Sequence, residues 1–336
     1  MATKKKMLEA AAGGAGGAGL DITEVFSTYL YTGTGSARSI VNEIDLAGEG
    51  GIVWLKSRSD ATPHTLHTTD IGALNYLVPN NTSGNNAGLA GYGLTAFNSN
   101  GFSLGTDYEG ENGSGKTYAS WTFRKAPKFF DIVTYTGTGS AQNISHNLGS
   151  VPGMIIVKRT DAANNWTCFH RSLASNGAGA WIELNNSDAA QTDPAVNYWN
   201  NTGPTDSVFT VATDSSVNAS GGTYVAYLFA HNDSGDGGFG PDGDQDIIKC
   251  GVFTDSASGG VVDLGWEPQW VLVKNADYSG SWVILDSMRG YTVSGVVDNY
   301  LFPNSSGAEA TYDFGAITST GFTYKNDAVG ENIYMA

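Results

Sequence analysis

Apolar residues fall in short runs along the chain, and turns rich in glycine, asparagine and serine separate these runs. Residues 26–31 alternate between apolar and polar side chains, which is typical of a strand with one buried face. Residues 51–55 carry an apolar run that ends at Lys56, which predicts a strand in the interior. The pattern predicts an all-β protein with almost no helix beyond residue 20.

The same order of strands and turns occurs three times. All three copies share an apolar strand that ends in lysine; the first two share a Tyr-Thr-Gly turn, and the first and third share a later segment of the type Asn-Tyr-Leu-x-Pro-Asn, where the second has Trp-Ile-Glu-Leu-Asn. The matching segments are residues 31–37 and 135–141, then 53–56, 155–158 and 271–274, and finally 75–80, 181–185 and 299–304. Repetition on this scale indicates an architecture of three similar units.

The length of 336 residues has room for three domains of about 100 residues, a size that can bury its own core. We therefore predict three tandem β-sandwich domains, of jelly-roll or lectin-like type, at residues 25–130, 131–232 and 247–336. A Gly/Asp linker is expected at residues 233–246.

The closing strand of the third copy is shorter than those of the first two. The first two strands run on to Phe123 and Phe229, whereas the third stops at Ala336. From this comparison we expect an unfilled inner position and an unprotected strand edge in the third sandwich. We also expect that the natural chain continues beyond Ala336, with a phenylalanine within a few residues.

Residues 1–24 form a separate N-terminal region. Their first half predicts about two helical turns, and residues 13–19 are a flexible glycine-rich linker. Two interpretations remain open: a disordered tail, or a segment that orders only when it docks into a partner. In the second case, the residues that attach the protein to a larger assembly are Lys4, Lys5, Lys6, Met7 and Leu8.

Composition excludes several kinds of partner. The chain has 17 basic and 33 acidic residues, and its net charge of −16 argues against nucleic acid. No run of apolar residues is long enough to insert into a membrane, and residues 10–19 lack the large apolar residues of a secretion signal. The two cysteines, Cys168 and Cys250, stand in different repeats, so we expect two buried, reduced thiols.

The sequence contains no recognisable catalytic motif. The five histidines lack metal-ligand spacing, and His64 occupies the repeat position of Trp166 and Trp282, which favours packing. Neighbouring carboxylates such as Asp107 and Glu109 are interpreted as solvated surface, although an enzyme that digests surface polysaccharide is a third alternative. We therefore expect no enzymatic activity. The lysines that end the repeated strands are interpreted as residues with their charge in water.

Two segments are candidate binding sites. Asp242, Asp244 and Asp246 alternate in the way that a calcium loop begins, but the closing glutamate is missing, so a solvated linker is the alternative. Tyr198 and Trp199 lie in an Asn-rich loop, and exposed aromatic residues flanked by amides are suited to stacking on sugar rings. The alternative is that these two rings cover one end of the sandwich.

Several segments resemble virion structural proteins of tailed phages that infect marine cyanobacteria and related hosts. They are residues 118–130 (YASWTFRKAPKFF), the repeated Tyr-Thr-Gly-x-Gly, residues 237–250 and the opening Met-Ala-Thr-Lys-Lys. The resemblance covers almost the whole chain. It implies a component of the virion, on the exterior of the tail or capsid and made in the host cytoplasm, with no enzymatic residues.

Two hypotheses follow from this resemblance. The first is a tail fibre or adhesin that is attached to other virion proteins by its N-terminus and binds a host-surface glycan. The second is a protein that decorates the capsid or tail without binding a receptor. The cyclic symmetry common in fibres leads us to expect a homo-oligomer, namely a trimer.

Overall fold

The computed structural model describes residues 19–108, 110–176, 179–192, 198–255, 259–292, 296–326 and 329–336. Strands dominate this part of the chain, which confirms the all-β prediction. The helices in this part are short: α2 (Ile22–Val25), α3 (Leu46–Glu49), α4 (Ser215–Asn218), and the 3-10 helices η1 (Arg171–Asn176) and η2 (Ser287–Arg289). The helical turns predicted before residue 13 lie outside the described residues.

The first repeat is a sandwich of two antiparallel sheets. Its larger sheet has the order β1-β9-β3-β4 and its smaller sheet the order β2-β8-β7. The strands are β1 (Phe26–Thr32), β2 (Arg38–Val41), β3 (Gly51–Ser57), β4 (Thr65–Thr68), β7 (Leu94–Asn98), β8 (Gly101–Leu104) and β9 (Thr117–Arg124), with a short ladder of β5 (Asn75–Tyr76) and β6 (Asn86–Ala87) beside them.

The second repeat keeps this arrangement with one strand added at the edge of its larger sheet, β10-β16-β12-β13-β14, and one strand fewer in its smaller sheet, β11-β15. Its strands are β10 (Phe130–Thr136), β11 (Gln142–Ser145), β12 (Met154–Arg159), β13 (Trp166–His170), β14 (Ile182–Glu183), β15 (Val208–Val211) and β16 (Thr223–Phe229). Both cysteines are buried and free, as the sequence predicts.

The third repeat again has the order β17-β25-β19-β20, with β18-β24-β23 as its smaller sheet and β21-β22 beside it. Its strands are β17 (Cys250–Thr254), β18 (Gly260–Asp263), β19 (Trp270–Asn275), β20 (Val283–Asp286), β21 (Asp298–Tyr300), β22 (Ala310–Tyr312), β23 (Gly315–Thr318), β24 (Gly321–Tyr324) and β25 (Glu331–Met335).

The closing strand lies inside the sheet in every repeat. β25 pairs with β17 on one side and with β19 on the other, as β9 and β16 do with their neighbours. The ladder includes Ala336, whose N–H and carbonyl both bond to Lys249. The unprotected edge that we expected at this strand is therefore wrong, because the strand has partners on both sides.

Each larger sheet is buried on both faces. In β3, Val53 and Leu55 face the interior of their own sandwich, whereas Ile52 and Trp54 belong to a core that extends through all three repeats. β19 alternates in the same way, because Val271 and Val273 pack locally and Leu272 joins the shared core. This two-sided burial explains why the strand has an apolar run with little alternation.

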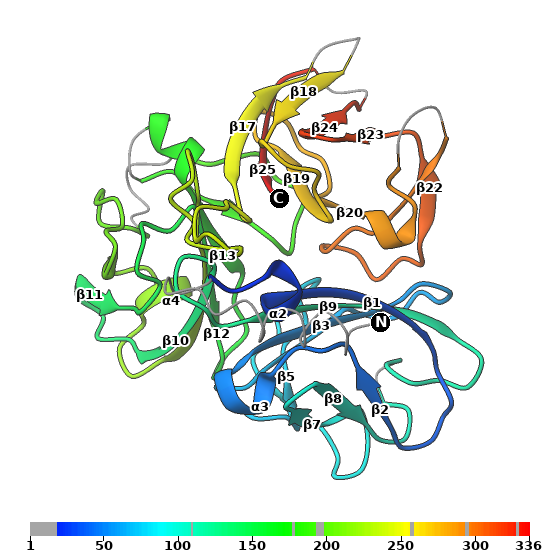
Figure 1. The fold of residues 1–336 in the computed structure, drawn as a ribbon. Coiled ribbons are helices and arrows are strands. Elements are labelled where there is room, and N and C mark those ends of the chain that lie inside the picture. Colours follow the sequence, from blue (N-terminus) through cyan, green and yellow to red (C-terminus); the bar gives the residue numbers. More distant parts are fainter. Residues whose placement is uncertain are drawn as a thin grey trace.

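The three repeats lie as lobes around a common centre (Figure 1). An equivalent backbone hydrogen bond joins each pair of neighbouring repeats. Its acceptor is the carbonyl two residues after the lysine that ends the repeated strand. The three bonds run from the Asn85 N–H to the Thr160 carbonyl (2.7 Å), from Ala190 to Ala276 (2.8 Å) and from Glu309 to Arg58 (2.9 Å). The contacts run head to tail and close into a ring within one chain.

A ring nitrogen makes a second equivalent contact at each junction. Trp166 Nε1 donates to the Val78 carbonyl at 3.2 Å, and Trp282 Nε1 donates to the Glu183 carbonyl at 2.9 Å. His64 takes this role at the third junction, where its Nε2 lies 3.1 Å from the Phe302 carbonyl. The packing role inferred for His64 is confirmed, and the residue also closes the ring.

The tautomer of His64 follows from its two neighbours. Trp54 Nε1 donates to His64 Nδ1 at 2.9 Å, so Nε2 carries the proton that bonds to the Phe302 carbonyl. Burial lowers the pKa of His64 well below its ordinary value, which keeps the ring neutral in this position.

Residues 233–246 pack against the body of the protein. Phe239 is 2% exposed, and its ring lies 6.3 Å from that of Phe129. The Gly240 N–H donates to the Leu20 carbonyl at 3.0 Å, which fixes the start of the described chain to this segment. The segment expected as a solvated Gly/Asp linker is therefore anchored by one aromatic residue, while Asp242 and Asp244 within it are exposed.

The three lysines that end the repeated strands are buried. Lys56, Lys158 and Lys274 are each at most 1% exposed, so the expectation that their charges lie in water is wrong. Each ammonium group donates to two backbone carbonyls; the acceptors of Lys158 are Thr82, in the neighbouring repeat, and Asn164. Burial lowers the pKa of all three to about 8.

This burial predicts a pH dependence that can be measured with Lys158→Met. The pKa of Lys158 is about 8 in the folded protein, whereas that of an unfolded lysine is about 10.4, so the unfolded state binds more protons between these values. The contribution of Lys158 to the free energy of unfolding therefore rises with pH in this window.

We expect the free energy of unfolding of the wild type, relative to that of Lys158→Met, to rise by roughly 2 kcal/mol between pH 7 and pH 10. Urea unfolding of both proteins measures this difference. Tyrosine and cysteine titrations cancel in the difference, because both proteins contain them. A difference that stays constant or shrinks as pH rises would contradict this account of the buried ammonium group.

Candidate functional site

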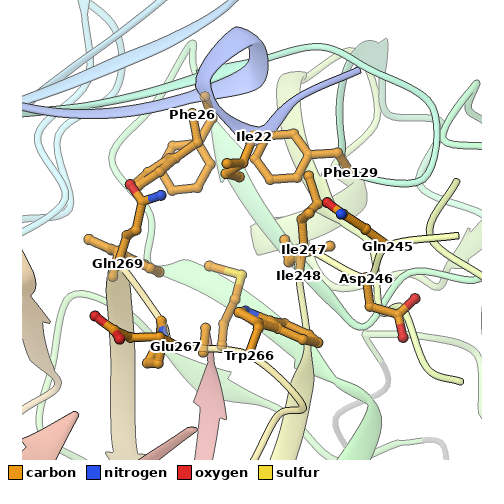
Figure 2. Close-up of a pocket in the computed structure, with 15 residues that line it drawn as sticks. Ile22, Phe26, Phe129, Gln245, Asp246, Ile247, Ile248, Trp266, Glu267 and Gln269 are labelled. Atoms are coloured by element: carbon orange, nitrogen blue, oxygen red, sulfur yellow. The ribbon is translucent and has the colours of Figure 1, made fainter. Parts of the chain in front are cut away.

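A half-open cavity of about 230 Å³ lies where the first and third repeats meet near the centre. α2 contributes Ile22, the first repeat contributes Phe26, Phe123 and Phe129, and the third repeat contributes Trp266, Trp270 and Met335. Figure 2 shows Phe26, Ile22 and Phe129 on one side of the opening and Trp266 on the other. Glu267 and Asp246 lie at the rim, with their carboxylates turned away from the cavity.

The wall of the cavity is part of the aromatic cluster that joins the repeats. The ring of Phe123 lies 4.8 Å from Phe26, 5.5 Å from Phe229 and 5.6 Å from Trp270, so it contacts aromatic residues of all three repeats. Such an environment favours apolar and aromatic groups and disfavours charged ones. The cavity can therefore hold a small apolar group by packing.

Trp270 leaves one polar atom unpaired in this wall. Its indole Nε1 is buried and has no hydrogen-bond partner in the described structure. A buried donor without an acceptor costs free energy, whereas the face of an aromatic ring offers it a weak acceptor. Repeat comparison could have located this site in the sequence, because Trp270 aligns with Ile52 and Met154, which pair with Phe123 and Phe229.

A second cluster that the sequence did not suggest is a buried His–Glu pair in the first repeat. His67 Nε2 lies 2.7 Å from Glu111 Oε1, and its Nδ1 lies 3.2 Å from the Ala73 carbonyl. Both ring nitrogens of His67 therefore face oxygen atoms of other residues. The pair ties β4 to the loop before β9, where Tyr31 also donates to the Glu111 carbonyl at 2.7 Å.

The sequence gives no signal for this pair. His67 and Glu111 are 44 positions apart and belong to no common motif. Only the folding of the loop over β4 brings them together.

Tyr198 and Trp199 are packed in the core. They are 7% and 2% exposed, the Tyr198 ring lies 4.7 Å from Trp181, and the Trp199 ring lies 5.9 Å from Phe169. The exposure that we expected for glycan stacking is therefore wrong. A hydrogen bond from the Ala212 N–H to the Tyr198 carbonyl holds this segment against the sandwich.

Asp242, Asp244 and Asp246 do not converge on one point. Asp242 and Asp244 are exposed, whereas Asp246 accepts hydrogen bonds from the N–H groups of Gly235 and Gly237. Within the described ranges, no three histidine, cysteine or acidic residues are placed to hold a metal ion. The calcium interpretation is wrong for these residues, and Asp246 instead braces its loop.

The proposed attachment residues, Lys4, Lys5, Lys6, Met7 and Leu8, lie outside the described residues, so their role stays a prediction. No helix in the described part of the chain is long and apolar enough to cross a membrane.

The fold defines a single-chain ring of three sandwich-like repeats around an aromatic centre. The chain belongs to the family described as Domain of unknown function (DUF7483), whose model matches residues 21–336. No curated protein matches the chain. The family match spans all three repeats and begins just after the glycine-rich segment, so the ring is the family unit.

Proposed function

We propose that this protein is a structural component of a phage virion, a tail fibre or adhesin that its N-terminal segment attaches to the particle. The observation that supports this most is the position at which the chain enters the ring. α2 lies in the middle of the three lobes (Figure 1), and Ile22 forms part of the central cavity.

Close contacts fix this entry point. A side chain at Gly19 would lie 2.2 Å from the Gly238 carbonyl oxygen, so the chain passes tightly against the segment that holds Leu20. The composition of residues 13–19 predicts a flexible tether beyond this point. A tether at the centre presents all three lobes outward from one attachment point, which suits host-surface attachment.

The rigidity and charge of the ring support a structural role. The shared core and the equivalent junctions hold the repeats in one arrangement, and the net charge of −16 favours a soluble, repulsive surface. The resemblance to phage virion proteins supplies the context of the particle. The proposal includes no enzymatic activity.

A protein that decorates the capsid or tail without binding a receptor is the second candidate. It is favoured by the burial of Tyr198 and Trp199, the residues we had considered for glycan contact. One chain with three similar repeats could also occupy a threefold symmetry axis of a particle as a monomer. The homotrimer predicted from the sequence is retained as a separate proposal, which sedimentation equilibrium tests directly.

Removal of residues 2–19 tests the proposed attachment. We expect phage particles made with the truncated protein to lack it, while the purified truncated protein keeps its β circular dichroism and its thermal transition. A matched control replaces the glycines of residues 13–17 by serine and leaves Gly19, which has no room for a side chain, unchanged; it keeps a flexible tether and should keep the protein on the particle. Retention of the truncated protein on purified particles would contradict the proposal.

A further inference from the structure

The third repeat has no histidine in its sequence, but a buried histidine from each of the other two repeats contacts one of its backbone carbonyls. In the first repeat, His64 Nε2 lies 3.1 Å from the Phe302 carbonyl. In the second repeat, His170 Nε2, at the end of β13, lies 3.0 Å from the Tyr334 carbonyl. The two histidines are 0% and 1% exposed, so both contacts lie in the interior of a junction.

The other nitrogen of each ring already accepts a hydrogen bond. His64 Nδ1 accepts from Trp54 Nε1 at 2.9 Å, and His170 Nδ1 accepts from the Ser172 N–H at 3.2 Å. Each ring is therefore neutral, with its single proton on Nε2 and directed to the third repeat. A second proton would have to sit on Nδ1, where it would face an N–H donor and break the hydrogen bond that orients the ring.

The charged groups that act on His64 come from both sides of its junction. They are Lys56 in the first repeat and Arg289 in the third, and Arg289 is in turn paired with Asp286 and Glu309. Burial, followed by the charge of Lys56, lowers the pKa of His64 well below its ordinary value. The positive charges nearby disfavour a further positive charge on the imidazole.

The surroundings of His170 are similar. Burial lowers the pKa of His170 to about 4, and Arg171 and His231 lower it further, against the opposite effect of the hydrogen bond to the Tyr334 carbonyl. Both histidines that hold the third repeat are thus kept neutral by burial next to cationic or titratable basic groups.

We propose that His64 and His170 form an acid-sensitive closure of the ring, in which proton uptake by the two imidazoles opens the contacts that join the third repeat to its neighbours. The junction between the first and second repeats has the indole of Trp166 at the position of His64, and an indole takes up no proton in this range. This switch is a property of the ring, so it goes beyond the proposed function and does not depend on attachment to a particle.

The direction of the pH effect follows from the protons that each state binds. An unfolded histidine has a pKa of about 6.5, whereas that of His170 in the closed ring is about 4. Between these values the unfolded chain binds protons that the closed ring excludes. The closed ring should therefore be most stable above pH 6.5 and should lose stability as the pH falls towards 4.

Two substitutions remove the titration and keep a donor at each junction. His64→Trp copies Trp166 and Trp282, which hold the equivalent positions, and His170→Gln keeps an amide N–H for the Tyr334 carbonyl. Between pH 6 and pH 5, the folded-to-unfolded ratio of the wild type should fall about sevenfold more than that of either variant, and about fiftyfold more than that of the double variant. Urea unfolding measures these ratios, and circular dichroism at pH 7 checks folding. If His64→Trp does not fold, His64→Gln replaces it.

Cys250 reports whether the third repeat moves away from the second. A side chain at Gly153, in the second repeat, would lie 2.8 Å from Cys250 Sγ, so the thiol is packed in this junction. In a Cys168→Ala background Cys250 is the single thiol, and its reaction with 4,4′-dithiodipyridine gives a mixed disulfide and releases pyridine-4-thione. We expect its rate at pH 5, relative to that at pH 7, to be higher with both histidines present than in the double variant. The proposal is overturned if unfolding or the Cys250 rate depends on pH in the same way in both proteins.

Discussion

Replacing Arg289 by methionine is expected to lower the free energy of unfolding by about 3–5 kcal/mol. Arg289 Nε lies 2.6 Å from Asp286 Oδ2, and both side chains are fully buried. The same carboxylate oxygen accepts a hydrogen bond of 2.9 Å from Trp121 Nε1, in the first repeat. Methionine fills much of the volume, so the loss comes from a buried carboxylate without its counterion.

Two further variants separate charge from packing. Arg159→Met removes an ion pair of similar geometry at the surface, where Arg159 Nε lies 2.9 Å from Asp161 Oδ1, and should cost about 1 kcal/mol or less. Arg289→Met combined with Asp286→Asn removes both buried charges and keeps an acceptor for Trp121, so it should recover most of the loss. Chemical denaturation measures the free energy of unfolding of all the variants. If the double variant lost as much stability as the two single substitutions together, the unpaired carboxylate would not be the cause.

Phe123→Ala is expected to cost about 3–5 kcal/mol and to weaken all three repeats together. The Phe123 ring contacts Phe26, Phe229 and Trp270, one partner from each repeat. Because the shared core extends through all three repeats, loss of the Phe123 side chain affects every repeat. Differential scanning calorimetry should show one transition, shifted to lower temperature.

Tyr278→Ala is the control for this substitution, because its ring is 56% exposed and its loss should leave the Tm almost unchanged. Phe102→Ala removes an equally large, fully buried ring that packs only within the first repeat. It should also lower the Tm of a single transition. If either variant shifts one transition and leaves others in place, the repeats do not share one cooperative core.

The strands and their threefold repetition could be predicted from the sequence because they depend on neighbouring residues. The apolar run that ends at Lys56 has no clear polar face, and this pattern already indicates a buried strand. The pattern does not show what covers the second face. That face packs against other repeats, so its partners are set by the closure of the ring and not by local spacing.

The positions that misled the sequence analysis share one cause, which is packing between distant segments. The packing role of His64 was predicted, but its contact with Phe302, 238 positions away, was not, because only closure of the three repeats brings the two residues together. The asparagines beside Trp199 suggested an exposed loop, but Asn200 and Asn201 adopt left-handed backbone angles that turn the chain at the end of the sandwich.

The failure of the calcium interpretation has a local cause. Carboxylates at every second residue lie on the same side only when the backbone between them is a regular extended strand. Gly243, between Asp242 and Asp244, has a φ of 69°, so the backbone between the two residues is a left-handed turn and not a regular strand. Composition alone could not reveal this turn.

Electron microscopy of purified phage particles tests the central claim most directly, because it locates the protein and its orientation together. The account predicts a three-lobed density on the outside of the particle, with the centre of the ring, where Gly19 meets the segment around Phe239, directed towards the particle. Density on the capsid supports the decorating protein, whereas density on the tail fits both the fibre and a protein that decorates the tail. Purified particles that lack the protein, or lobes that face the particle while the centre points outward, would contradict the account.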